Sequence, residues 1–321
     1  MSIDLKNTTF IIPLRVDTGD RLRNVVLSTA FLLNKFDTNV IIKEVDSERR
    51  FEAYCLPIIK RLADTTNLNH IFEVESRTDD SFHRTKILND MVMESTTDIV
   101  VNYATDILLP ISSYTQAVEM LQGDYDVVYP YRFGKQGERK VKVDFTIRTP
   151  EDMANFENYP DVKKFISSYD PDSFENYFYY PHQQGEGWAE YGMVQFFDRR
   201  VYMNGFLENV GFIAYAPEDV ERHYRWKTLG YNIGRVDNYA YHLEHERTQN
   251  SCFHNPHMQR NNELWEQLKV LKKEQLTEYY QQQEYVKERL KCLLLVVLCV
   301  YLYLVGLLTI LILLLSMGGV L

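Results

Sequence analysis

Cysteine is scarce in this sequence. The 321 residues include four, Cys55, Cys252, Cys292 and Cys299, and none belongs to a CxxC pair. Such spacing argues against a zinc knuckle or a disulfide framework and is typical of a reducing compartment. Basic blocks are also absent, and the formal net charge is -10. We therefore expect no nucleic-acid partner, because nucleic-acid-binding surfaces concentrate lysine and arginine.

Several catalytic signatures are missing as well. The chain has no GxGxxG dinucleotide fingerprint, no Walker phosphate loop and no GxSxG nucleophile elbow. The segment HLEHER (242–247) holds two histidines but lacks the HExxH pattern of a zinc protease. A nucleotidyltransferase is also disfavoured, because PLRVDTGDR (13–21) stands where its glycine-rich, lysine-bearing first loop would be.

One long hydrophobic run is present, at residues 292–317, and it contains no charged residue. A bilayer core needs about 20 apolar residues in a helix, so we expect a transmembrane anchor there. Lys287, Arg289 and Lys291 precede the run, and no charge follows it. The positive-inside rule then predicts a single-pass C-terminal anchor with residues 1–291 on the cytoplasmic side of the membrane.

Strand and helix patterns alternate from the first residues onward. Runs typical of strands, such as TFIIPL (9–14), NVIIKEV (39–45) and DIVVNYA (98–104), alternate with helical patterns such as DRLRNVVLSTAFLLNKF (20–36) and FHRTKILNDMVMES (82–95). This order predicts βαβ units, and therefore an α/β, Rossmann-like fold with a mostly parallel sheet and helices on both faces.

The rest of the chain divides into segments of different composition. Residues 132–190 mix acidic and aromatic residues with turn formers, and residues 261–291 have a polar helical pattern with leucines on one side. We expect the second segment to form a stalk helix, and its pairing in a homodimer is an open alternative. The expected organisation is a domain at 1–260 with an insertion or lid at 132–190, a stalk helix at 261–291 and a transmembrane anchor at 292–317.

Polar residues stand at the ends of several predicted elements. Asp106 follows a buried strand, Glu218 and Asp219 open a helix, and His242 follows a strand end. A carboxylate with an imidazole suits a divalent cation, Mn2+ or Mg2+, which is needed where a diphosphate leaves. A separate carboxylate at a helix start can deprotonate an incoming hydroxyl. Purely structural roles stay open for each: a strand-end turn, a helix cap or a core histidine.

Four segments, taken in order, resemble glycosyltransferases of the GT-A fold. They are TTFIIPLRVDTGDR (8–21), FHRTKILNDMV (82–92), DIVVNYATDILLP (98–110) and APEDVERHYRWKTLGYNIGRVDNYAYHLEHER (216–247). They are similar to family 2-like enzymes of capsule and glycan synthesis, and to the beta-galactosyltransferase and chondroitin-polymerase C-terminal module. The resemblance covers roughly residues 8 to 256.

The resemblance implies a metal site. The family's DxD motif, which holds the cation that grips a nucleotide-sugar diphosphate, matches Ala104-Thr105-Asp106. The second carboxylate is present, and alanine replaces the first. Asp106 is therefore implied as a metal ligand, and the histidine after the following strand, His242, is implied as another.

The resemblance also implies the catalytic groups. The family's GGED or GPED motif matches Ala216-Pro217-Glu218-Asp219, so that Ala216 replaces a glycine. Asp219 is implied as the base that activates the acceptor hydroxyl, and Glu218 as a residue that holds the acceptor sugar.

The remaining expected contacts are to the two substrates. The nucleotide-sugar-binding set implied by the resemblance is Pro13, Arg15, Arg84, Asn89, Thr105 and Asp106. Trp188 and Tyr191 are expected to stack on the acceptor sugar, with core packing an open alternative for both.

The expected function is transfer of a sugar from a nucleotide-sugar donor, a UDP-sugar, to a hydroxyl of a glycan acceptor. By the resemblance, the reaction inverts the anomeric centre and uses a divalent cation. The alternative is a binding module that keeps the fold, has lost catalysis and recruits a partner glycosyltransferase. Ala104 and Ala216 point toward that alternative, whereas Glu218, Asp219 and His242 point away from it.

Overall fold

The computed structural model describes residues 2–141, 187–215, 217–248, 250, 255–289 and 291, together with 303, 305, 307 and 309. Three sequence-based expectations lie outside these residues wholly or in large part. They are the insertion or lid at 132–190, the substitution at Ala216 and the anchor at 292–317.

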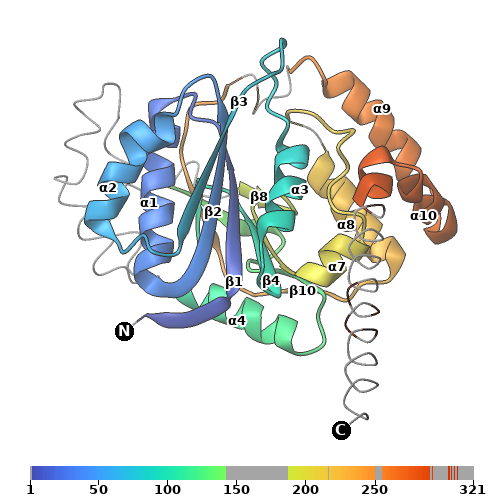
Figure 1. Ribbon diagram of the computed structural model, residues 1–321, viewed down its shortest axis with the longest axis horizontal. Coiled ribbons are helices and arrows are strands. Elements are labelled where there is room, and N and C mark those ends of the chain that lie inside the picture. The colour runs from blue at the N-terminus through green and yellow to red at the C-terminus, as the bar shows by residue number, and fades with distance from the viewer. Residues whose placement is uncertain are drawn as a thin grey trace, which may run out of the picture. The chain divides into compact units, whose positions relative to one another are not determined.

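A seven-stranded sheet forms the centre of the fold (Figure 1). Its strand order is β10 (Ile233–Arg235), β6 (Val127–Tyr129), β9 (Val194–Asp198), β4 (Ile99–Tyr103), β1 (Ile3–Leu14), β2 (Phe36–Asp46) and β3 (Leu68–Val74). All neighbours are parallel except β9, which runs antiparallel to both β4 and β6. The predicted mostly parallel α/β sheet is confirmed, and the reversed strand β9 is an addition.

Helices cover both faces of this sheet (Figure 1). One face carries α1 (Gly19–Lys35) and α4 (Ile111–Gln122), and the other carries α3 (Arg84–Glu94), α7 (Arg199–Asn204) and α8 (Glu218–Leu229). A short π-helix, η1 (Phe51–Cys55), leads directly into α2 (Leu56–Leu62).

The aromatic side chains show how the two faces are filled. Phe10 of β1 packs edge-on against Tyr103 and Phe196, and the Tyr114 ring of α4 packs against them from the same face. Phe197, the next residue of β9, points to the other face and contacts Trp226 of α8. Alternate residues of a strand face opposite sides of the sheet. Because helices cover both sides, the residues facing either side are buried, and the central strands are apolar almost throughout.

Helix α8 begins and ends where the sequence predicts. Pro217 precedes it, and acidic residues occupy its first turn, where they are favoured by the helix dipole. Gly230 ends it at φ 95°, in the left-handed region that glycine adopts without a Cβ clash. Local sequence thus defines both ends of α8, and Glu218 and Asp219 are its first two residues.

A second, four-stranded sheet lies beside the first, with strand order β5 (Ile107–Leu108), β11 (Ala240–Leu243), β7 (Gly134–Val141) and β8 (Gly187–Ala189). The two described ends of the expected lid are thus strands, since β7 and β8 pair with each other across residues 142–186.

The helix expected at residues 261–291 is not continuous among the described residues. Helix α9 (Met258–Leu268) ends before a turn at residues 269–272, and α10 (Lys273–Gln281) follows. The chain divides into compact units at residues 1–270 and 271–321, so α9 belongs to the first unit.

Two contacts explain why α9 belongs to that first unit. The Asn261 side chain donates to the carbonyl of Ile213 at 2.7 Å, and the Trp265 ring packs edge-on against Tyr224 of α8. This buried face is not available for pairing with a second copy, so homodimerisation through α9 is not supported.

No helix among the described residues is long and apolar enough to cross a membrane. The anchor and the cytoplasmic placement stay predictions.

Candidate active site

A cavity of about 400 Å³ opens at the carboxyl ends of β1 and β4. Its wall is made by the residues after β1, the turn after β4, the first turn of α8, strand β11 and the segment before β9. Ligands of open α/β sheets bind at this edge. The predicted site residues that line the cavity are Pro13, Arg15, Arg84, Thr105, Asp106, Glu218, Asp219 and His242.

Pairing of β5 with β11 brings Asp106 and His242 together. His242 pairs with Ile107, and the backbone N–H of Leu243 donates to the carbonyl of Asp106 at 2.7 Å. The Tyr103 hydroxyl donates to the carbonyl of Ile107 at 2.7 Å and so braces the turn that carries Asp106. Hydrogen bonds within the chain, one from the backbone and one from a side chain, therefore hold Asp106 and His242 side by side.

A third residue, His245, completes a group able to hold a metal ion. Asp106 Oδ2 lies 3.3 Å from His242 Nε2 and 2.9 Å from His245 Nε2, and one ligand atom from each residue lies within 4.8 Å of the others. One carboxylate and two imidazoles suit Mn2+ and related transition metals, whereas Mg2+ prefers an all-oxygen shell.

Glu138 of β7 orients the first of these histidines. His242 Nδ1 lies 2.6 Å from Glu138 Oε1, which assigns the Nδ1 proton to that contact and leaves Nε2 directed at Asp106. A carboxylate behind a metal-binding histidine fixes its tautomer and raises its basicity. Strands β7 and β11 are parallel neighbours, so Glu138 and His242 come from the same sheet.

The pKa values of this cluster are strongly perturbed. Burial works to lower the pKa of His242, but Asp106 and Glu138 outweigh it and raise the pKa to about 9. Burial works to raise the pKa of Asp106, but the two imidazoles outweigh it and hold the pKa well below its usual range. A cation bound at His242 Nε2 takes the place of a proton there, because metals bind the neutral imidazole.

Glu218 and Asp219 form an acidic pair on the cavity wall. Burial, and then the charge of Asp219, raise the pKa of Glu218, and the nearby Arg84 and Arg222 offset only part of this. Burial also raises the pKa of Asp219. Among the described residues no donor reaches Glu218 Oε2, which is buried. A buried acceptor oxygen without a donor is costly, and a ligand hydroxyl would satisfy it.

Gly192 allows the close approach of Asp219. A Cβ at position 192 would lie 2.5 Å from Asp219 Oδ2, which is too close for any residue other than glycine unless the carboxylate moves. The Val220 backbone N–H donates to Asp219 Oδ1 at 2.8 Å and holds the carboxylate from the helix side. The Asp219 carboxylate is therefore held between α8 and the segment before β9.

A buried polar network lies beneath the acidic pair. Arg84 contacts Glu218 at 3.6 Å and donates to Asn102 Oδ1 at 2.9 Å. Asn102 donates to Gln195 Oε1 at 2.8 Å, and this oxygen also accepts from Arg222. Arg222 Nη1 donates to both carboxylate oxygens of Glu208 at 2.8 Å. Among the described residues Arg222 Nε has no acceptor, so this network is not fully satisfied. Arg84 is held at its edge by the contacts with Glu218 and Asn102.

Asn89 belongs to this network rather than to the cavity wall. Its side chain donates to the carbonyl of Glu208 at 3.0 Å and accepts from the Glu208 N–H at 2.7 Å. Asn89 is not among the cavity-lining residues, so its placement gives no support to the expected nucleotide contact.

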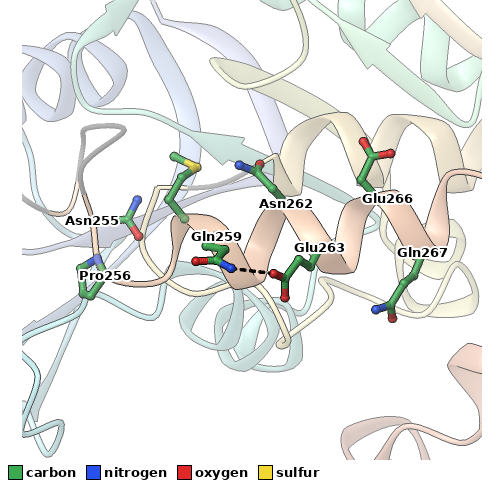
Figure 2. A pocket seen from close by; sticks show the side chains of 8 residues that line it. Asn255, Pro256, Gln259, Asn262, Glu263, Glu266 and Gln267 are labelled. Carbon is green, nitrogen blue, oxygen red and sulfur yellow. Dashed lines mark hydrogen bonds between the residues drawn. The ribbon is translucent and has the colours of Figure 1, made fainter.

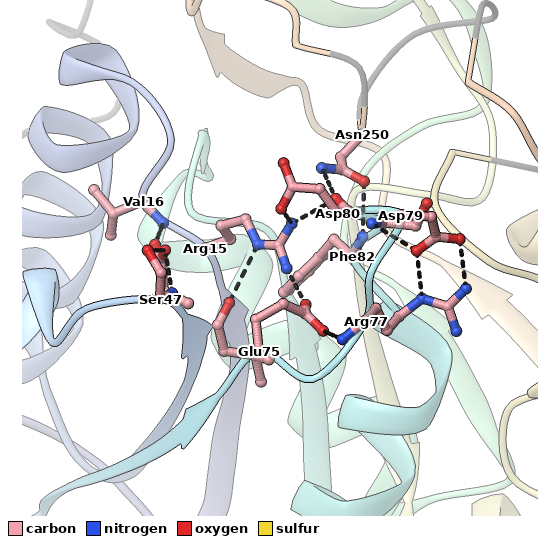
Figure 3. A network of polar contacts seen from close by, with 12 residues as sticks. Arg15, Val16, Ser47, Glu75, Arg77, Asp79, Asp80, Phe82 and Asn250 are labelled. Atoms are coloured by element: carbon pink, nitrogen blue, oxygen red, sulfur yellow. Dashed lines mark hydrogen bonds and ion pairs between the residues drawn. The ribbon is translucent and has the colours of Figure 1, made fainter.

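Arg15 reaches the cavity but is engaged elsewhere (Figure 3). Its guanidinium forms an ion pair with Glu75, donates to the Asp80 carbonyl at 2.7 Å and donates to the Val45 carbonyl at 3.2 Å. These contacts hold the loop after β3 against β1. Any contact of Arg15 with a nucleotide would add to them or replace them.

The expected acceptor aromatics are placed differently. Tyr191 stacks on His223 with ring centroids 3.9 Å apart and lies next to Gly192, but it does not line the cavity. Trp188 is in β8, opposite Lys135 in the backbone pairing, and its side chain lies outside what the structure describes.

A larger hollow, of about 790 Å³, follows one exposed face of α9 (Figure 2). Its described lining is Asn255, Pro256, Met258, Gln259, Asn262, Glu263, Glu266 and Gln267. These side chains include no imidazole and no arginine, and Gln259 already donates to Glu263 at 2.9 Å. Among the described residues, the cluster able to hold a cation lines the cavity at the sheet edge and not this hollow.

Three site residues had no strong signal in the sequence. His245 was visible as the second histidine of HLEHER, but nothing marked it as a ligand. Glu138 and Gly192 stand in segments with no motif, and only the pairing of β7 with β11 and the approach of Asp219 reveal their roles.

No family model matches the chain, and no curated protein matches it. Solved structures similar to it are glycosyltransferases at low identity. A mannosyltransferase from Pyrobaculum calidifontis in complex with GDP-Man and Mn2+ is 16% identical over 74% of this chain and 56% of its own, with a TM-score of 0.40. GalNAc-T7 with UDP, GalNAc and Mn2+ is 10% identical over 74% of this chain and 44% of its own, with a TM-score of 0.44. The Drosophila beta1,4galactosyltransferase 7 catalytic domain, in complex with xylobiose, is 12% identical over 80% of this chain and 79% of its own, with a TM-score of 0.37. This chain thus spans about half the length of the first two.

Proposed function

We propose that this protein is a metal-assisted glycosyltransferase. It transfers a sugar from a nucleotide-sugar donor, a UDP-sugar, to a hydroxyl of a glycan acceptor, with inversion at the anomeric carbon. One observation carries the proposal: a triad able to hold a cation and a buried acidic pair line the same cavity.

The triad fits a resident divalent cation. Asp106, His242 and His245 would hold it, and Glu138 would keep His242 in the right tautomer. Mn2+ bound there would neutralise the charge that develops on a departing diphosphate. The chemistry of the donor set, one carboxylate and two imidazoles, favours Mn2+ over Mg2+.

Asp219 is the proposed base. As the acceptor oxygen bonds to the anomeric carbon, the bond from that carbon to the diphosphate oxygen breaks, and the hydroxyl proton passes to Asp219. The raised pKa of Asp219 brings its basicity closer to the working pH, which favours proton transfer. Glu218 Oε2, which lacks a donor among the described residues, would accept a hydrogen bond from a second hydroxyl of the acceptor.

The direct test uses the full-length chain. We would titrate it with UDP in the presence and absence of Mn2+ by calorimetry. We would then assay release of UDP from a panel that includes UDP-sugars and GDP-Man, with and without glycan acceptors. Mn2+-dependent UDP binding with acceptor-dependent release supports the proposal. Mn2+-dependent binding without any turnover would instead support the binding module. No binding of UDP in any condition would reject the transferase, and the search should then move to protein partners.

Gly192→Ala should slow transfer without unfolding the protein. The new Cβ would meet Asp219 Oδ2 at 2.5 Å, and the carboxylate can relieve the clash by rotating away. A displacement of the base by about 1 Å costs roughly 10²-fold in rate. We would measure kcat and Tm together. A variant with normal turnover, or one with a large loss of Tm, would contradict this role of Gly192.

Glu218→Gln should stabilise the free protein, and most clearly at high pH. The folded-state pKa of Glu218 is raised to about 8. Stability is therefore lost progressively as the pH rises from the ordinary pKa of glutamate to that value, and the cost is absent below the ordinary pKa. Removing the charge should therefore add about 0.5–2 kcal/mol at pH 8 and little at pH 4. Thermal unfolding from pH 4 to 8 checks this. A lower Tm at pH 8 would mean that the Arg84 contact outweighs burial.

The anchor stays a proposal. If residues 292–317 span a membrane, the full chain should remain in the membrane fraction after alkaline carbonate extraction, whereas a variant with lysines inside that segment should not.

A further inference from the structure

Residues 244–248, which carry His245, run along the start of α1. The segment from Asp17 to Arg23 leads into α1 and forms its first turn. It is far from His245 in sequence, yet it contributes three charged side chains that contact residues 244–248: Asp17, Asp20 and Arg23. We refer to these three as the α1 clamp.

Two members of the clamp hold the peptide groups on either side of His245. Arg23 donates to the carbonyl of Glu244 at 2.6 Å, and Asp20 Oδ2 accepts from the backbone N–H of Glu246 at 3.0 Å. Arg23 and Asp20 also pair with each other at 2.7 Å. The Arg23 side chain is 3% exposed and that of Asp20 is 25% exposed, so the guanidinium is withdrawn from water while the carboxylate is only partly buried. The hydrogen bonds of both groups are charge-assisted.

Further attachments follow along the chain. Asp17 Oδ2 accepts from the Thr248 hydroxyl at 2.7 Å. Asn250 accepts from the Phe82 N–H at 2.7 Å and donates to the Asp80 carbonyl at 3.1 Å (Figure 3). His242 lies within β11, where hydrogen bonds to neighbouring strands hold its backbone, but His245 lies beyond the end of that strand. Its position therefore depends on these side-chain contacts.

We propose that Asp20 and Arg23 are positioning residues that set the third ligand of the metal site. They touch neither the cation nor a substrate. They fix the backbone on both sides of His245, so that its Nε2 faces Asp106 at 2.9 Å. Without them, the segment would be free to swing His245 away, leaving Asp106 and His242 as a two-residue site. The proposal rests on the metal site of the proposed function.

The test compares Arg23→Met with a matched control, Arg225→Met. Arg225 is also buried, pairs with a carboxylate, Glu221, at 3.0 Å and donates to the backbone carbonyl of Gly205, and neither partner belongs to the metal site. Mn2+ affinity is measured on full-length protein by electron paramagnetic resonance of the free ion. Loss of an outer-shell partner typically weakens metal binding about 10–100-fold. We expect that loss for Arg23→Met and none for Arg225→Met, even though both lower Tm.

A double-mutant cycle with His245→Ala shows whether Arg23 acts through His245. If it does, Arg23→Met should weaken Mn2+ binding in the wild-type background and have little further effect in the His245→Ala background. Equal losses in both backgrounds would overturn the proposal. Asp20→Asn, which keeps the shape of the side chain, provides a second and milder variant should Arg23→Met fail to fold.

A separate measurement keeps the two proposals distinguishable. Hydrogen exchange of the peptide covering residues 244–248 needs no metal, and it should quicken in Arg23→Met but not in Arg225→Met. Unchanged exchange would overturn the clamp even if Mn2+ binds. Faster exchange together with no Mn2+ binding by the wild type would leave the clamp as a contact but reject the metal site, and with it the proposed positioning role.

Discussion

Replacement of Asp106 by alanine is expected to abolish Mn2+-dependent binding of UDP. Asp106 supplies the only carboxylate of the triad, since the other two members are His242 and His245. Position 104, two residues earlier, is an alanine. Loss of an outer-shell partner already costs about 10–100-fold in metal affinity, and loss of a direct ligand should cost more. Calorimetric titration with UDP, with and without Mn2+, measures this.

Asp37→Ala is a suitable control for this prediction. Asp37 lies at the start of β2, at the opposite end of the sheet from the cavity, and pairs with Lys6 at 3.1 Å near the surface. Its removal changes the net charge of the chain equally but should leave Mn2+ and UDP binding unchanged. If Asp106→Ala binds UDP in Mn2+ as the wild type does, the triad is not the metal site.

Asp219→Asn should lower kcat by about 10²–10⁴-fold, the range associated with a general base. The amide cannot take the proton of the acceptor hydroxyl, but it can still accept the Val220 N–H that holds the side chain at 2.8 Å. Donor binding, which depends on the other wall of the cavity, should be nearly unchanged. Initial rates with saturating donor and acceptor, set beside UDP titrations, separate the two effects.

The same variant distinguishes an enzyme from a binding module. If the wild type turns over and Asp219→Asn does not, the acidic pair is catalytic. If kcat is unchanged in Asp219→Asn, the base lies elsewhere, and Glu190, which also lines the cavity, becomes the next candidate. If the wild type binds UDP with Mn2+ but never transfers a sugar, the result would favour the alternative, a binding module that recruits a partner glycosyltransferase.

Local sequence patterns were sufficient for most of the fold. The apolar runs of β1, β2 and β4 and the helical spacing of α1, α3 and α8 predicted those elements, because each depends on side chains a few residues apart. Asp106, Glu218 and Asp219 could be selected because each stands at the end of an element. His242 was selected on the same expectation, although it proves to lie within β11. The carboxyl ends of parallel strands meet at one edge, so their convergence was foreseeable.

Other features required the positions of residues distant in sequence. The reversed direction of β9, the break between α9 and α10, and the use of Asn89 and Arg15 in buried contacts all depend on tertiary neighbours. The sequence alone does not show whether a polar side chain contacts a ligand or another part of the protein. Both use the same donors and acceptors, and only the partner differs.

The metal site shows the division most clearly. The sequence by itself selected Asp106 and His242, and its resemblance to the GT-A family implied a metal site with alanine in place of the first carboxylate. His242 was expected just after a strand, but it lies within β11. Only the tertiary structure decided that His245 would take up the third position, with Glu138 behind His242 and the α1 clamp beside His245. The physical reason is that ligand geometry depends on strand pairing and on side-chain contacts between segments far apart in the chain, which no local pattern encodes.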